Sequence, residues 1–201
     1  MHTFYNIKMN IYINFSPHIE KILRFTTGDN NGPIHLKKGM RSIKFWKKKY
    51  PYMPRWQLMK QPDLNDLFLS ALMQIGEDSS IEHISASYSL AYNEEEYKRM
   101  TVAQRKGLVP FCLPEKIPDG TKQIPASRRC CMQKNRGQAF RQAVIHFCYE
   151  QLADFMHQQQ EMKKENFKPV AAIRDFTDKY DLSVEDYDNL VRQYYRHPAC
   201  I

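Results

Sequence analysis

The chain has little glycine, no cysteine pair at metal-binding spacing and no long apolar run. Its 201 residues include 7 glycines, too few for a collagen-like or low-complexity protein. No uncharged apolar stretch approaches the ~20 residues of a membrane-spanning helix, and the first residues lack the basic and apolar regions of a signal peptide. These absences predict a packed cytoplasmic protein that has no membrane partner.

Catalytic and cofactor motifs are missing as well. The five cysteines contain no CxxC pair and no cysteine–histidine spacing typical of zinc, and their odd number favours reduced structural thiols. The seven histidines form no HExxH motif, and the chain has neither a G-x-S-x-G nor a P-loop sequence. We therefore expect a non-catalytic protein with no metal and no other cofactor.

A metal-dependent nuclease is the enzyme alternative that the sequence offers. Asp63, Glu96 and Lys98 match the carboxylates and the lysine that such a site needs. Asp63, however, stands where a helix should begin, and Glu96 stands in the first turn of another helix, so both carboxylates are better explained by their places at helix starts. The nuclease is the weakest of three functional hypotheses.

Apolar spacing predicts a helix-dominated α+β fold. Alternation of apolar and polar residues indicates strands over 7–15 and 83–92, and a short strand could lie at 108–113. Spacings of three and four residues indicate helices over about 17–25, 40–50, 63–75, 94–106, 137–165, 170–180 and 184–196. We expect a small antiparallel sheet packed on helices, together with a long amphipathic helix and a C-terminal helical hairpin.

The charge is divided unevenly along the chain. The net charge is +8, yet residues 143–201 carry 7 basic and 10 acidic side chains. On this basis we divide the chain into a basic α+β domain, residues 1–135, which includes a proline-punctuated loop over 107–135, and a helical part, residues 136–201, packed on it as one globule. The basic excess of the first part favours a polyanionic partner.

Two basic clusters are candidate nucleic-acid sites. The stretch between Asp29 and Asp63 holds nine lysines and arginines without a carboxylate, together with both tryptophans. Cations interleaved with aromatic rings suit phosphate contacts and base stacking, although Trp46 could belong to the core and the lysines could simply face solvent. The second cluster lies over 122–141, where a flexible basic loop is the alternative. The candidate contact residues are Lys37, Lys38, Arg41, Lys44, Lys48, Arg55, Trp56, Arg128, Arg129 and Arg136.

The last two predicted helices have the apolar spacing of a helix-turn-helix unit. The second of them, however, begins with Glu185, Asp186 and Asp188, and carboxylates there would face the phosphates of DNA. We therefore expect a helical hairpin that packs on the body of the protein and serves self-association or partner docking.

The leading hypothesis is thus a small non-catalytic protein that contacts nucleic acid, either DNA or RNA, through its basic, aromatic-rich segment. The alternative is a structural or adaptor protein whose basic face meets an acidic protein surface, or which self-assembles into a homo-oligomer, without nucleic acid.

Overall fold

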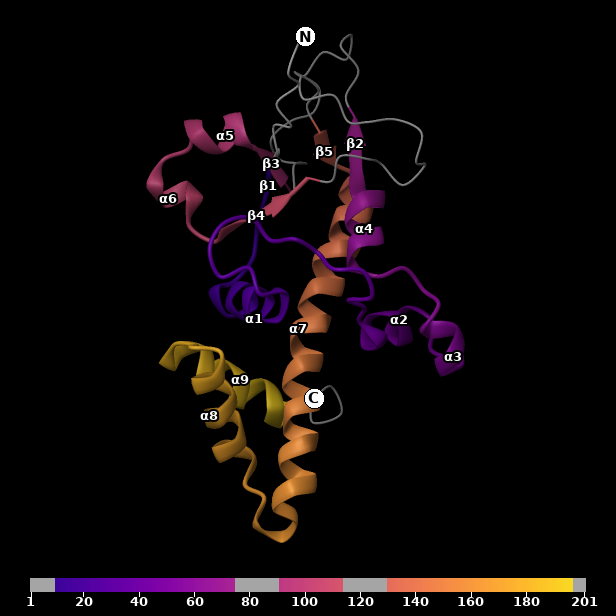
Figure 1. Cartoon of the computed structure of the whole chain (residues 1–201), viewed down its shortest axis with the longest axis vertical. Coiled ribbons are helices and arrows are strands. Elements are labelled where there is room, and N and C mark those ends of the chain that lie inside the picture. Colours follow the sequence, from indigo (N-terminus) through magenta and orange to yellow (C-terminus); the bar gives the residue numbers. More distant parts are fainter. Residues whose placement is uncertain (1–9, 75–90, 114–129, 197–201) are drawn as a thin grey trace, which may run out of the picture. The chain divides into compact units, whose positions relative to one another are not determined.

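The computed structural model describes residues 10–74, 91–113 and 130–196 (Figure 1). These residues form two compact units that are interleaved along the chain. The described parts of the first unit are residues 10–15, 29–40, 62–74, 91–113 and 130–141, and those of the second unit are 16–28, 41–61 and 142–196. The division at residues 135–136 that charge and spacing suggest stays a prediction.

The first unit contains a three-stranded antiparallel sheet. Its central strand β1 (Asn10–Asn14) pairs with β3 (Ala91–Asn93) on one side and with β4 (Leu108–Cys112) on the other. The strand predicted over 7–15 and the short strand considered at 108–113 are therefore confirmed in their described residues. Most of the strand predicted over 83–92 lies outside the described residues.

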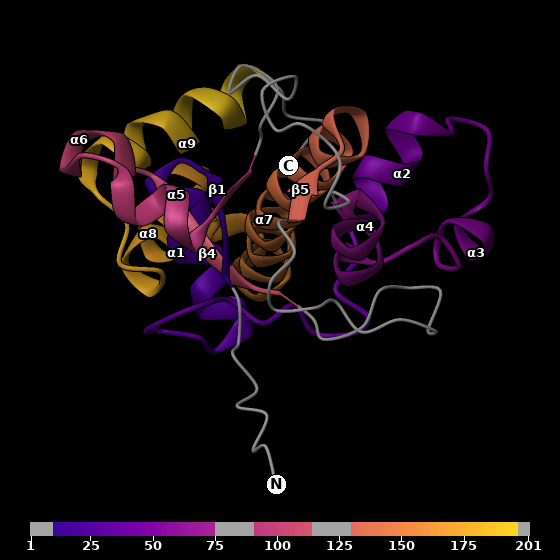
Figure 2. The same cartoon turned by 90° about the horizontal axis from the view of Figure 1, so that it is seen from above.

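A short helix packs against this sheet. Figure 2 shows α5 (Glu94–Arg99) beside the strands, and the ring of Tyr97 stacks on that of Tyr12 with 3.9 Å between centroids. The prediction of a single helix over 94–106 is wrong. Thr101 caps a second helix, α6 (Val102–Arg105), by accepting from the backbone N–H of Gln104. A threonine at this place offers the backbone a cap in place of another helical turn.

The helix predicted over 63–75 ends earlier than expected. Asp63 caps α4 (Leu64–Ala71) as predicted, but the chain then turns into β2 (Leu72–Gln74), which pairs with β5 (Cys130–Met132). The apolar spacing continues past Ala71, so the pattern alone gives no stop. Pairing with a distant strand decides the conformation.

Aromatic rings form the core of the first unit. Phe68, Phe111 and Phe140 are fully buried, and their centroids lie 5.1–5.8 Å apart. Phe140 belongs to the long helix α7 (Lys134–Lys163), which matches the helix predicted over 137–165 and supplies residues to both units.

The second unit is helical. Its elements besides α7 are α1 (Pro17–Thr27), α2 (Ile43–Lys49), α3 (Arg55–Leu58), the 3₁₀ turn η3 (Lys164–Asn166), α8 (Pro169–Lys179) and α9 (Val184–Arg196). The predicted C-terminal hairpin is confirmed as α8 and α9. The helix predicted over 40–50 begins only at Ile43, because the hydroxyl of Ser42 accepts from the backbone N–H of Phe45.

The hairpin is held by apolar and aromatic contacts. Phe176 on α8 is fully buried, and its ring lies 5.5 Å from that of Phe155 on α7 and 4.4 Å from that of Tyr180. Leu190 of α9 is buried as well. Phe140, Val144 and Phe147 of α7 are buried as their spacing predicts, whereas Phe155 is half-buried.

The fold class is helix-dominated α+β with a small antiparallel sheet. Within the part of the chain that the structure describes, none of the helices combines the length and the apolar character that crossing a membrane requires.

Candidate nucleic-acid interface

Residues 41–61 form one basic surface segment of the second unit, which we call the basic segment. It contains α2, α3 and the turn between them, with seven lysines and arginines and no carboxylate. Five of the seven cations are exposed: Lys47, Lys48, Lys49, Arg55 and Lys60. Charge of one sign is therefore concentrated on a short stretch of surface.

The start of α2 is anchored to α7. Glu150 of α7 accepts from the backbone N–H of Lys44, and the rings of Phe45 and Trp46 are buried beneath α2. Burial raises the pKa of Glu150, while hydrogen bonds from the backbone of Lys44 and the hydroxyl of Ser42 oppose the rise. These contacts hold the first turn of α2 and leave the lysines of its last turn exposed.

His146 of α7 also lies against α2. Its ring is 6.3 Å from that of Phe45, centroid to centroid. Burial lowers the pKa of His146, and the positive charges of Lys48 and Lys44 lower it further. No sequence pattern pointed to His146 or Glu150, because each lies about 100 positions from the segment that it contacts.

The two tryptophans lie in opposite environments. Trp46 is 4% exposed and belongs to the core, as one interpretation of the sequence predicted, whereas Trp56 on α3 is 60% exposed. The Nζ atom of Lys60 lies 5.0 Å from the centroid of the Trp56 ring. Tyr52, in the turn between α2 and α3, is 99% exposed. The basic segment therefore presents Trp56 and Tyr52 to solvent among its cations, together with the less exposed Tyr50.

The predicted contact residues within the basic segment do not share one helix face. Arg41 precedes α2, is half-buried and donates from Nε to the backbone carbonyl of Gln61. Lys44 is half-buried, and Lys48, Arg55 and Trp56 are exposed. Arg41 therefore lies outside the helix, because Ser42 caps α2 after it.

The other predicted contact residues belong elsewhere. Lys37 and Lys38 are exposed residues of the first unit. Arg136, also in the first unit, donates from a guanidinium nitrogen to the carbonyl of Ser70 at 3.1 Å. Arg128 and Arg129 lie outside the described residues. The predicted contact residues that share the basic segment of the second unit are thus Arg41, Lys44, Lys48, Arg55 and Trp56.

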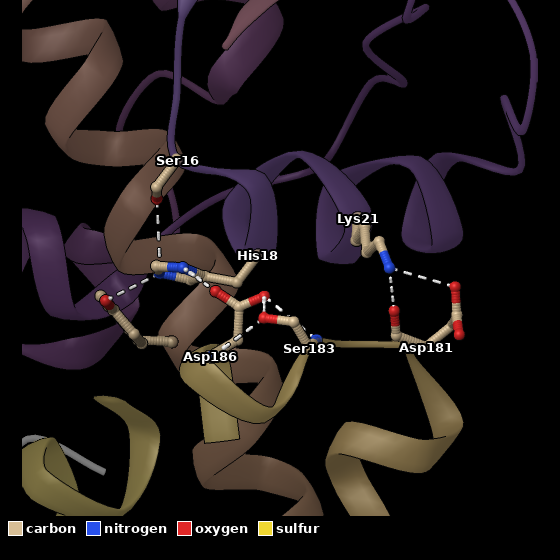
Figure 3. A network of polar contacts seen from close by, with 7 residues as sticks. Ser16, His18, Lys21, Asp181, Ser183 and Asp186 are labelled. Atoms are coloured by element: carbon tan, nitrogen blue, oxygen red, sulfur yellow. Dashed lines mark hydrogen bonds and ion pairs between the residues drawn. The ribbon is translucent and has the colours of Figure 1, made fainter. Parts of the chain in front are cut away.

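A second group of polar side chains joins α1, α7 and α9 (Figure 3). Nδ1 of His18 lies 3.1 Å from Oδ1 of Asp186, and Nε2 lies 3.4 Å from the hydroxyl of Ser16 and 3.3 Å from that of Tyr149. The order hydroxyl, imidazole, carboxylate is that of a serine hydrolase. Here two hydroxyls share one imidazole nitrogen, and the carboxylate of Asp186 also completes the cap of α9 through Ser183. The network therefore serves to connect three helices.

The carboxylates of the nuclease hypothesis are held at helix starts. Asp63 is buried and accepts from the backbone N–H groups of Asp66 and Gly39, at 2.9 and 2.7 Å. Glu96 accepts from the backbone N–H of Asn93 at 2.8 Å. In the described residues, no group of three or more histidine, cysteine, aspartate or glutamate side chains is placed to hold a metal ion.

The chain matches no protein-family model, no curated protein and no solved structure. We therefore infer function from the geometry and charge of the basic segment.

Proposed function

We propose that the protein binds nucleic acid through the basic segment. The observation that carries this proposal is the set of five exposed cations, Lys47, Lys48, Lys49, Arg55 and Lys60, on a stretch that has no carboxylate. Each cation that neutralises a phosphate releases a condensed counterion, and this release supplies most of the affinity of a non-specific complex. The role is binding without catalysis.

The exposed lysines of α2 are held on an ordered helix before any ligand binds. Glu150 and the buried rings of Phe45 and Trp46 fix α2 against α7, so its exposed lysines are carried by an ordered element. A charged surface held in place loses less conformational entropy on binding than a flexible tail does. Lys37, Lys38 and Arg136 of the first unit are further candidate contacts, and the proposal does not depend on them.

The test removes charge without touching the anchor of α2. The variant Lys47→Gln, Lys48→Gln, Lys49→Gln changes three exposed cations of the basic segment. A matched control, Lys163→Gln, Lys164→Gln, Lys168→Gln, removes the same charge from exposed residues of the same unit. Binding of a labelled oligonucleotide is measured by fluorescence anisotropy over a salt series that begins at about 50 mM, where electrostatic affinity is strong.

We expect the first variant to bind more weakly and to flatten the log–log salt dependence by about two to three units if all three lysines contact phosphates. The control should bind as the wild type does. Equal losses in both variants would mean that net charge, and not this segment, drives binding. Absence of wild-type binding at about 50 mM salt would favour the adaptor hypothesis, in which the basic segment meets an acidic protein surface.

The helical hairpin has a separate proposed role. Glu185 and Asp188 of α9 are exposed, and their charges oppose the approach of a phosphate backbone. Self-association or partner docking through α8 and α9 stays a proposal for this part of the chain.

A further inference from the structure

We infer that the basic segment takes single-stranded nucleic acid, with one base stacked on the indole of Trp56 and a second base on the ring of Tyr52. This inference rests on the proposed function and names its substrate class. It follows from the aromatic rings of the segment, whereas the proposed function follows from the cations.

The exposure of Trp56 is the first observation. An indole buries a large apolar area when it can, and this unit does bury its other tryptophan, Trp46, to 4% exposure. On α3 the buried side chain is Leu58, while Trp56 is left 60% exposed. The core of the unit therefore does not account for the indole at this position, whereas a ligand with a flat face would.

The surroundings of Trp56 are the second observation. The ammonium group of Lys60 lies 5.0 Å from the centroid of the indole ring, a cation–π distance. With the ammonium group on one face of the ring, a base would stack on the other face, and a phosphate beside that base would meet the positive charge of Lys60. Arg55, the neighbour of Trp56 in the chain, is exposed and adds a second positive charge.

Tyr52 extends the same surface. It is 99% exposed, in the turn of five residues between α2 and α3 that also contains Pro51 and Pro54. Prolines restrict the backbone of such a turn, so the tyrosine ring is presented with less conformational freedom than on an open loop. Exposed rings on a surface rich in lysine and arginine are the arrangement by which proteins bind unpaired bases without sequence preference.

The preference for single-stranded over duplex nucleic acid follows from where the faces of the bases are accessible. In a duplex the base faces are stacked on one another, and a surface ring meets phosphates and groove edges instead. In a single strand the bases can unstack and lie on a side-chain ring, which contributes about 1–3 kcal/mol per base. An acidic protein surface would also bury exposed tryptophan and tyrosine, so the oligonucleotide measurements decide between the two partners.

The experiment compares three labelled oligonucleotides of one mixed sequence, about 20 nucleotides long: single-stranded DNA, single-stranded RNA and duplex DNA. The protein variants are Trp56→Ala, Trp56→Phe and Tyr52→Ala. Tyr195→Ala is the matched control, because Tyr195 is an aromatic residue of the same unit that is 61% exposed on α9. Circular dichroism establishes that each variant is folded.

We expect Trp56→Ala to weaken single-strand binding by about 5-fold to about 150-fold, the equivalent of one lost stacking contact. Duplex binding should change by less than about 2-fold, Trp56→Phe should restore most of the affinity, and Tyr195→Ala should bind like the wild type. Tyr52→Ala should likewise weaken single-strand binding more than duplex binding. Comparison of single-stranded DNA with single-stranded RNA shows which of the two nucleic acids the segment binds more tightly.

Intrinsic fluorescence gives a second readout. The chain has two tryptophans, so Trp56→Phe leaves only the buried Trp46. Single-stranded oligonucleotide should quench the wild type and leave the Trp56→Phe variant almost unquenched. If wild type binds single strand and duplex alike and Trp56→Ala changes neither, the inference is overturned while the proposed function stands. If wild type binds no oligonucleotide, both are overturned.

Discussion

Nδ1 of His18 lies 3.1 Å from Oδ1 of Asp186, so residues 168 positions apart in the chain join α1 to α9 (Figure 3). Both side chains are largely buried. The carboxylate accepts only, so the imidazole donates from Nδ1 and turns Nε2 toward the hydroxyls of Ser16 and Tyr149. The other carboxylate oxygen accepts from the backbone N–H and hydroxyl of Ser183. One carboxylate thus caps α9 and fixes it to α1.

Asp186→Ala should therefore destabilise the protein more than Ser183→Ala. Loss of the serine hydroxyl costs about 0.5–2 kcal/mol, as for other helix caps. Loss of the carboxylate also leaves the imidazole of His18 without its acceptor, which adds about 1–3 kcal/mol. Urea unfolding of His18→Ala, Asp186→Ala and the double variant should give a coupling free energy of about 0.5–3 kcal/mol. Additive losses would show that the two side chains do not interact in solution.

Phe140→Ala should cost about 3–5 kcal/mol of unfolding free energy, because it empties the centre of the aromatic core of the first unit. Phe68 and Phe111 would each lose a ring partner. Met162→Ala is the control, since Met162 lies on the same helix α7 and is exposed; it should stay within about 0.5 kcal/mol of wild type. A cost for Phe140→Ala close to that of the control would contradict the described core.

The pH dependence of stability should change when Glu150 becomes glutamine. Burial raises the pKa of Glu150 in the folded protein above the ordinary value of about 4.5. Between these two pKa values the folded state binds more protons than the unfolded state, so this group makes stability fall as pH rises through that window. Glutamine keeps an oxygen that can accept from the backbone of Lys44 and does not titrate.

The unfolding free energy of Glu150→Gln minus that of wild type should therefore increase as pH rises from about 4 toward neutrality. The charged neighbours of residue 150, which are His146, Lys44 and Lys48, are the same in both proteins, so the difference isolates the carboxyl group of Glu150. The measurement is urea unfolding followed by tryptophan fluorescence at several pH values. A difference that is flat or that decreases with pH would mean that burial of the carboxylate does not dominate.

Sequence patterns predicted the elements that are long and amphipathic. The apolar stripe through Phe140, Val144 and Phe147 predicted α7, and the apolar spacing of the last two helices predicted the hairpin. Local signals suffice in these cases because the cap residues and the apolar face lie within one or two helical turns.

One boundary that depends on a distant partner could not be predicted. The change from helix to strand at Leu72 follows from pairing with Met132. No residue near Leu72 predicts this change. The candidate site shows the same limit. Its cations and tryptophans are plain in the sequence, but the anchoring of α2 by Glu150 and the exposure of Trp56 depend on the tertiary structure.

Substitution of Arg41 should mainly lower stability and substitution of Lys48 should mainly weaken binding, although both residues were predicted as phosphate contacts. Arg41 donates from Nε to the carbonyl of Gln61 and closes the two ends of the basic segment, whereas Lys48 is exposed on the last turn of α2. A hydrogen bond from a charged group is worth about 1.5–3 kcal/mol, and an exposed lysine seldom affects stability by more than about 0.5 kcal/mol.

Arg41→Ala should therefore lower the unfolding free energy by about 1–3 kcal/mol, and Lys48→Ala should leave it nearly unchanged. In the oligonucleotide assay Lys48→Ala should flatten the salt dependence by about 0.7–0.9 units, the share of one phosphate contact. Arg41→Lys keeps the charge but loses the planar fork of the guanidinium, so it should lose stability and retain the salt dependence of the wild type. Equal destabilisation by Arg41→Ala and Lys48→Ala would contradict the structural role of Arg41, because only Arg41 spans the segment from its first residue to its last.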